Sequence, residues 1–177
     1  MGLFNAIMEL LSDSDESNSD ESDSQDPDSP ECKGERFENF VIDKFSNDYF
    51  DIIERTHSWN TNKKRFVESS LNPDFTLRYR PTKEEFAIEC KYRSGLTQEG
   101  MLEYCKPDQF IRYKNFMYNK KIPVYIIVGF NGDDDDPDEI FVLPLKEMKY
   151  PTLYPSIFKK YSKNPEKNFH WKNGKLS

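Results

Sequence analysis

Two segments in the middle of the chain alternate strictly between apolar and polar residues. Residues 74–80 read DFTLRYR, residues 85–93 read EFAIECKYR, and Pro81-Thr82-Lys83-Glu84 stands between them. A period of two over this length is typical of β-strands, and a short polar connection containing Pro is typical of a turn. The sequence therefore predicts an antiparallel β-hairpin, and the rest of the fold has to be built around it.

The alternation divides the second strand of this hairpin into two faces. The apolar face consists of Phe86, Ile88, Cys90 and Tyr92. The opposite face consists of Ala87, Glu89, Lys91 and Arg93. We expect the apolar face to contact the core, so a carboxylate and an ammonium group two residues apart are predicted on the other side of the strand.

The length of the turn sets which residues of the two strands lie opposite each other. With a four-residue turn, Asp74 pairs with Lys91. Thr76 then pairs with Glu89. Directly opposed side chains point to the same face, so Asp74, Glu89 and Lys91 are predicted to converge. Arg78 would lie further along the same face. An odd-length turn would reverse this parity, so the prediction depends on the turn.

Other segments supply the elements that flank the hairpin. Helical spacing of apolar residues predicts helices over 35–45 and 108–119. Strands are predicted over 50–55, 122–130 and 140–145, and the second of these is apolar throughout, as in a strand buried on both faces. The predicted order is helix, three strands, helix, two strands. We therefore predict an α/β fold with a mixed β-sheet flanked by helices.

The charge of the chain is unevenly distributed. The formal net charge is −7, but residues 1–31 hold ten acids and no Lys or Arg. A further acidic run lies at 133–139, which we interpret as a charged loop. Without these two segments, the rest of the chain carries an excess of about nine positive charges. We predict a disordered acidic tail over 1–32 and one domain over 33–177. A basic body is compatible with a phosphate-rich partner.

The three converging side chains have a specific chemical meaning. Two carboxylates close together repel each other, and a hard divalent cation relieves the conflict. Mg²⁺ prefers oxygen ligands and accepts one or two carboxylates, and Mn²⁺ is an alternative. Such a metal polarises a phosphoryl oxygen and acidifies water, while Lys91 offsets negative charge in the transition state. The residues predict hydrolysis of phosphodiester bonds.

Pro73-Asp74, fourteen further residues, and then Glu89-Cys90-Lys91 resemble the motif of the PD-(D/E)XK, or restriction-endonuclease-like, nucleases. The resemblance implies an αβββαβ core and a DNA endonuclease that leaves a 5′-phosphate. It implies that Asp74 and Glu89 bind Mg²⁺ together with the backbone carbonyl of Cys90. It also implies that Lys91 assists the attacking water.

Two flanking segments extend this resemblance. Residues 34–38 (GERFE) resemble the helix that precedes the motif in this family, and Glu38 matches its acid. Residues 109–113 (QFIRY) are similar to the Gln-x-x-x-Tyr pattern of helicase-associated nucleases, which implies that Gln109 and Tyr113 line the cleft. A place in the core is the alternative for Tyr113. Members of this family often dimerise, so a homodimer is one expectation, although the sequence defines no interface.

A short basic cluster precedes the first strand of the hairpin. It consists of Lys63, Lys64 and Arg65. A phosphate backbone would be attracted here, and we assign these residues, with Arg78, to substrate binding. A solvated loop is the alternative interpretation of the cluster.

Three alternatives stay open at this point. The hairpin acids and lysine also fit a salt-bridged, solvent-exposed face. The domain also fits a nucleic-acid-binding module that keeps the fold without the chemistry. A third interpretation is an interaction protein whose working part is the acidic tail. The odd number of cysteines, without metal-ligand spacing, predicts reduced thiols and a cytoplasmic protein, and no apolar run is long enough to span a membrane.

Overall fold

The computed structural model describes residues 28–56 and 72–177. The first 27 residues of the predicted acidic tail lie outside the described residues. The basic cluster Lys63, Lys64 and Arg65 lies outside them as well, so its predicted role stays a prediction.

The centre of the molecule is a six-stranded sheet with the strand order β1-β2-β3-β5-β6-β8. Its strands are β1 (Phe50–Arg55), β2 (Phe75–Tyr79), β3 (Glu84–Arg93), β5 (Val124–Asp133), β6 (Asp136–Pro144) and β8 (Ser162–Lys163). Strands β3 and β5 pair in parallel, while the other neighbours in this sheet pair antiparallel. The parallel step is possible because α4 (Pro107–Lys120) lies between β3 and β5 in the chain.

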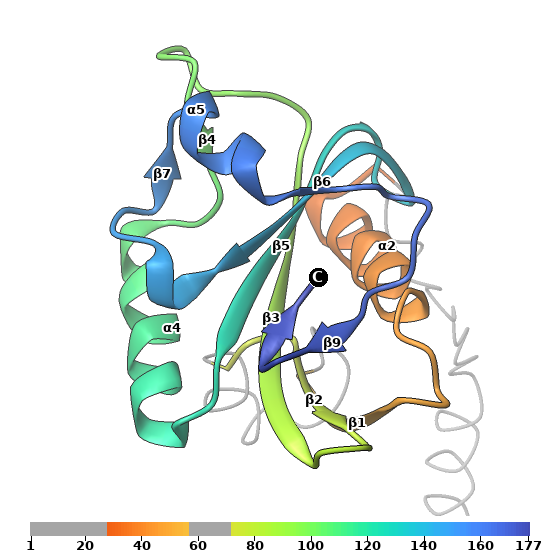
Figure 1. Ribbon diagram of the computed structural model, residues 1–177. Helices are drawn as coiled ribbons and strands as arrows, with labels where there is room; N and C mark the ends of the chain where they lie inside the picture. The colour runs from red at the N-terminus through yellow and green to blue at the C-terminus, as the bar shows by residue number, and fades with distance from the viewer. Residues whose placement is uncertain (1–27, 57–71) are drawn as a thin grey trace, which may run out of the picture.

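Helices cover both faces of this sheet, as Figure 1 shows. Helix α2 (Pro30–Asp43) buries Phe37 and Val41 in one cluster, which also contains Phe86 and Ile88 of β3. Helix α4 buries Tyr113 in a second cluster on the other face. The predicted mixed sheet flanked by helices is confirmed.

Short elements close the periphery of the two clusters. They are β4 (Leu102–Glu103), η1 (Leu145–Glu147), β7 (Thr152–Leu153), α5 (Pro155–Phe158), η2 (Lys159–Tyr161), β9 (Trp171–Lys172) and β10 (Lys175–Leu176). Trp171 stacks on Phe86 with ring centroids 4.4 Å apart, so the C-terminal aromatic residues pack against the sheet. None of the described helices is long and apolar enough to cross a membrane.

The predicted hairpin forms, but its register differs by two residues from the prediction. Thr76 lies opposite Ala87, and Arg78 lies opposite Glu85. The turn comprises residues 80–83, because the Lys83 N–H donates to the Tyr79 carbonyl at 2.8 Å and Lys83 adopts a left-handed φ of 62°. Because the shift is even, every side chain keeps its predicted face.

Two element boundaries also differ from the prediction. Helix α2 begins at Pro30 and not near residue 35, because the Ser29 hydroxyl accepts from the Cys32 N–H at 3.2 Å and Pro30 occupies the first turn. The acidic run predicted as a loop is a tight hairpin. Strands β5 and β6 pair as far as Asp133 and Asp136, so only residues 134 and 135 form the turn.

Gly129 of β5 allows α2 to approach the sheet. A Cβ at this position would overlap the ring of Phe37, with Cζ only 2.9 Å away. We expect Gly129→Ala to lower the free energy of unfolding by about 1–3 kcal/mol, as overpacking of a core does. Urea unfolding measures this loss. The control is Gly95→Ala, where no described atom lies within 4 Å of the new methyl group, and an equal loss in both variants would contradict the packing argument.

Candidate active site

Asp74 stands at the start of β2, where its backbone is held to the end of β1. The Thr56 N–H donates to the Asp74 carbonyl at 2.8 Å, and the Thr56 hydroxyl donates to the Pro73 carbonyl at 2.9 Å. The Asp74 side chain crosses to β3 and accepts from the Cys90 N–H at 2.7 Å. The motif's first acid is thereby fixed against its second strand.

The corrected register places Asp74 opposite Glu89, because Thr76 pairs with Ala87 two residues further on. Burial raises the pKa of Asp74 well above its ordinary value, and the neighbouring Glu89 carboxylate raises it further. The two acids are therefore close enough to repel each other in the absence of a cation.

Glu89 is almost fully buried, with 3% of its surface exposed. Its Oε1 accepts from the Tyr113 hydroxyl of α4 at 2.5 Å, and the same oxygen forms an ion pair with Lys91 Nζ. Its Oε2 is buried and has no hydrogen-bond partner among the described residues. This burial excludes the alternative of a solvent-exposed, salt-bridged face for Glu89, since α4 covers that side of the strand.

Lys91 is the cation of the cluster, and one fifth of its side chain is exposed. Burial alone would lower the pKa of its ammonium, but the Glu89 and Asp74 carboxylates outweigh burial and raise it. Lys91 is therefore charged at any physiological pH and faces a region with an excess of acid.

Glu38 approaches the same cluster from α2. Burial raises the pKa of Glu38 to about 7, the nearby Arg55 guanidinium opposes this, and Glu89 adds to it. Arg55 lies 3.7 Å from the Glu38 carboxylate and donates to Asn39 at 2.9 Å. A carboxyl group that titrates near neutral pH is suited to accept and release a proton.

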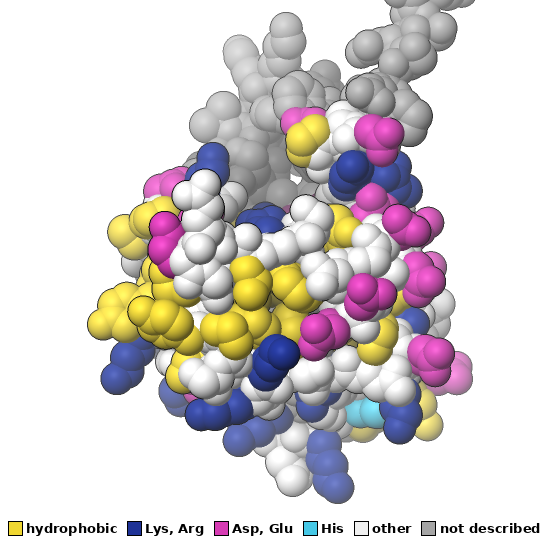
Figure 2. Space-filling view, turned by 90° about the horizontal axis from the view of Figure 1, so that it is seen from above, with side chains coloured by type: hydrophobic (Ala, Val, Ile, Leu, Met, Phe, Trp, Pro, Cys, Tyr) yellow, Lys and Arg dark blue, Asp and Glu magenta, His cyan; other side chains and the backbone are white. Residues whose placement is uncertain are grey.

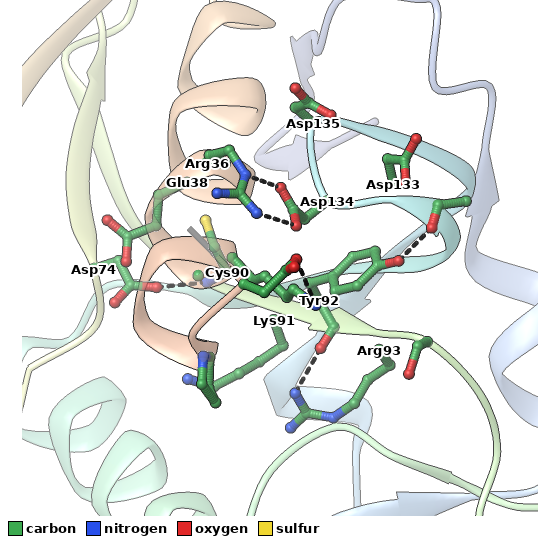
Figure 3. A pocket seen from close by; sticks show the side chains of 16 residues that line it. Arg36, Glu38, Asp74, Cys90, Lys91, Tyr92, Arg93, Asp133, Asp134 and Asp135 are labelled. Atoms are coloured by element: carbon green, nitrogen blue, oxygen red, sulfur yellow. Dashed lines mark hydrogen bonds and ion pairs between the residues drawn. The ribbon is translucent and has the colours of Figure 1, made fainter. Parts of the chain in front are cut away.

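Asp74, Lys91 and Glu38 line one open hollow with a volume of about 760 Å³. Its walls come from α2, the start of β2, the second half of β3 and the tip of the β5–β6 hairpin, as the close view in Figure 3 shows. Glu89 does not line the hollow; it is buried next to Lys91, with which it forms an ion pair. The structure thus gathers the three predicted acids, Glu38, Asp74 and Glu89, and Lys91 around one concavity.

The donor set is compatible with a divalent metal. Two repelling carboxylates and a buried carboxylate oxygen without a partner are what a cation would neutralise. Among the described residues, no three His, Cys, Asp or Glu side chains form a ready-made cage. Mg²⁺ does not require one, because it binds to one or two carboxylates and keeps several waters.

Three residues predicted to bind substrate do not line the hollow. Gln109 caps α4, where its Oε1 accepts from the Lys106 N–H at 3.0 Å. Arg78 pairs with Glu85 at 2.7 Å and lies further along the hairpin, outside the residues that line the hollow. Tyr113 is buried under Glu89 and positions that carboxylate instead of lining the hollow.

The hollow also contains side chains that the sequence did not single out. Arg36 of α2 donates to both carboxylate oxygens of Asp134, at 2.5 and 2.9 Å. Figure 2 shows acidic side chains gathered along one side of the upper face, the side on which Figure 1 places the β5–β6 hairpin. Only the acidic run itself was visible in the sequence, since Arg36 and Asp134 are 98 residues apart.

A scan of the sequence against protein-family models gives no match, and a search of curated proteins gives none. The structure is similar to that of Hjc from Archaeoglobus fulgidus, a Holliday junction resolvase from an archaeal hyperthermophile. The similarity has a TM-score of 0.50 at 17% identity and covers 72% of this chain and 93% of the resolvase chain. The fold is therefore restriction-endonuclease-like, as the sequence motif predicted.

Proposed function

We propose that this chain is a metal-dependent nuclease that hydrolyses phosphodiester bonds in DNA. The observation that carries the proposal is the convergence of Asp74, Lys91 and Glu38 on one hollow, with the half-satisfied Glu89 carboxylate directly beneath. Glu38 lies on α2, Asp74 immediately precedes β2, and Glu89 and Lys91 lie on β3, so the fold and not one local segment assembles them.

The residues divide the chemistry between them. Mg²⁺ or Mn²⁺ would be held by Asp74, Glu89 and the Cys90 carbonyl, and when bound it supplies a Lewis acid for the phosphoryl group. Lys91 Nζ offsets the negative charge that develops on the phosphate oxygens. The Glu38 carboxylate, with its pKa of about 7, accepts a proton from the attacking water.

A nucleic-acid-binding module without catalysis is the second candidate. The observation that favours it is the engagement of Glu89 Oε1 by both Tyr113 and Lys91, which keeps this acid beneath the wall of the hollow. Metal binding at the proposed site would use the other Glu89 oxygen, Oε2, which has no hydrogen-bond partner among the described residues. The two candidates therefore differ in whether metal ions change the behaviour of the protein.

A four-way DNA junction is the first substrate to test, because the structure with the similar fold is a Holliday junction resolvase. Duplex DNA, single-stranded DNA and RNA of related sequence complete the panel. Purified full-length protein is incubated with each substrate in Mg²⁺, Mn²⁺ or EDTA. We expect metal-dependent cleavage of DNA.

The variant that tests the site is Glu89→Gln, with Glu99→Gln, an exposed acid in the loop after β3, as the matched control. Cleavage that is lost in the first variant and kept in the second supports the nuclease. Binding of DNA by all three proteins without cleavage in any metal would instead support the binding module.

A further inference from the structure

The wall of the hollow opposite β3 is formed by the acidic tip of the β5–β6 hairpin. Asp133, Asp134 and Asp135 all line the hollow. A wall of carboxylates repels the phosphates of a nucleic acid, so its position beside a nuclease site requires an explanation. The three acids differ in their surroundings, and this difference shows which of them has a specific partner.

Asp134 is the buried member of the run, with 6% of its surface exposed, whereas its neighbours Asp133 and Asp135 are exposed. Both of its oxygens accept from Arg36, through Nε at 2.5 Å and Nη2 at 2.9 Å. This fork-to-fork contact has the geometry with which a guanidinium group also binds a phosphate. Asp134 therefore occupies the position in which Arg36 would hold a phosphate oxygen pair.

Arg36 is placed to contact substrate. It lies two residues from Glu38 on α2, and both side chains line the hollow together with Asp74 and Lys91 (Figure 3). Its side chain is 37% exposed, so it is accessible from the hollow while it is paired with Asp134. A phosphate near Lys91 would be within the same concavity as the Arg36 guanidinium.

The backbone of the hairpin is anchored so that Asp134 is presented to Arg36. The Tyr92 hydroxyl of β3 donates to the Gly132 carbonyl at 2.5 Å. Gly132 has a left-handed φ of 66°, and a Cβ there would come within 2.6 Å of the Asp136 carbonyl oxygen. The turn is thus fixed at its base, with the Asp134 carboxylate held against the Arg36 guanidinium.

We propose that Arg36 is a phosphate-binding residue of the substrate site and that Asp134 is an intramolecular competitor that occupies it in the free protein. Bound nucleic acid replaces the Asp134 carboxylate on the guanidinium with a backbone phosphate. The acidic hairpin thereby weakens non-specific binding and favours substrates that can displace it. This inference rests on the proposed function.

The test compares Asp134→Asn with Asp135→Asn in the full-length protein. Both changes remove one negative charge from the same turn, but only the first removes the carboxylate that accepts two hydrogen bonds from Arg36. The probes are a labelled four-way DNA junction and a duplex of the same sequence, bound in EDTA to prevent cleavage. We expect Asp134→Asn to tighten binding by about fivefold or more, and Asp135→Asn by less than about twofold.

Substitution of Arg36 provides a second, independent test. Arg36→Gln alone is expected to weaken binding about fivefold, and the slope of log Kd against log salt should decrease by about one. In the double variant Arg36→Gln with Asp134→Asn, the gain from Asp134→Asn should disappear. The Arg36→Gln measurement does not depend on the folding of the Asp134 variant, and thermal unfolding of each protein identifies a variant that is destabilised.

A purely structural ion pair would give a different pattern. It predicts that Asp134→Asn lowers the melting temperature and binds DNA no more tightly than Asp135→Asn, and that Arg36→Gln leaves the salt slope unchanged. Either result overturns the competitor role. If wild-type protein cleaves DNA in Mg²⁺ while these results are obtained, only the present inference fails. Absence of both binding and cleavage by the wild type refutes the proposed function itself.

Discussion

Replacing Lys91 by Met is expected to reduce the single-turnover rate of DNA cleavage by about 100- to 1000-fold, the usual loss when one group that stabilises transition-state charge is removed. Two lysines of the described residues line the hollow, Lys33 and Lys91. Lys33 lies in the first turn of α2 and pairs with Asp28 at 3.5 Å, so Lys91 is the ammonium beside Asp74 and Glu38. Binding of uncleaved DNA in EDTA should change little, because the loss falls on the transition state.

Two further variants separate catalysis from folding. Lys120→Met removes an exposed lysine at the end of α4 and should leave the cleavage rate unchanged. Lys91→Arg keeps a positive charge next to Glu89 and should preserve the melting temperature, but its planar fork cannot replace a point charge in the same place. A Lys91→Met protein that is folded and cleaves within about tenfold of the wild type would contradict the assigned role.

The hairpin shows how far the sequence alone could go. Its strict alternation predicted both strands and the face shared by Asp74, Glu89 and Lys91. The predicted cross-strand partner of Asp74, Lys91, was wrong. The left-handed conformation of Lys83 lets Glu84 join β3, which moves the turn by one residue and places Glu89 opposite Asp74. Periodicity determines parity, whereas the register also depends on where the turn closes.

Contacts between distant elements could not be predicted in this way. The sequence left Tyr113 either in the cleft or in the core; it is buried, and its hydroxyl donates to Glu89. Gln109 satisfies the N-terminus of its own helix, and this capping role competes with the role implied by the motif resemblance. The ion pair between Arg36 and Asp134 joins segments that only the folded sheet brings together.

Asp74 and Glu89 repel each other in the folded protein, so we expect that Asp74 supports activity but lowers stability. We expect Asp74→Asn to abolish metal-dependent cleavage and to raise the free energy of unfolding at neutral pH by about 0.5–2 kcal/mol, as neutralising a strained functional site does. Asn retains an oxygen that can accept from the Cys90 N–H, so the contact between β2 and β3 is kept. The increase corresponds to a melting temperature higher by a few degrees.

The sign of the pH dependence follows from the raised pKa. The ordinary pKa of Asp is 3.8, and the pKa of Asp74 in the folded protein is higher because of burial and of Glu89. The stabilising contribution of protonated Asp74 is therefore complete below pH 3.8 and is lost as the pH rises through the folded pKa. Asn at this position does not titrate, so the advantage of the variant over the wild type should grow from acidic to neutral pH.

Addition of Mg²⁺ should make the wild type more stable than Asp74→Asn. The cation offsets the repulsion between Asp74 and Glu89 in the folded wild type, so its melting temperature should rise with Mg²⁺ concentration, as mass action requires. Asp74→Asn lacks one ligand and should respond much less. The control is Asp48→Asn, an exposed acid before β1, which should match the wild type at every pH and Mg²⁺ concentration. If Asp74→Asn is less stable than the wild type at neutral pH without metal, the two acids do not repel each other in the folded state, and the case for a cation between them loses its physical basis.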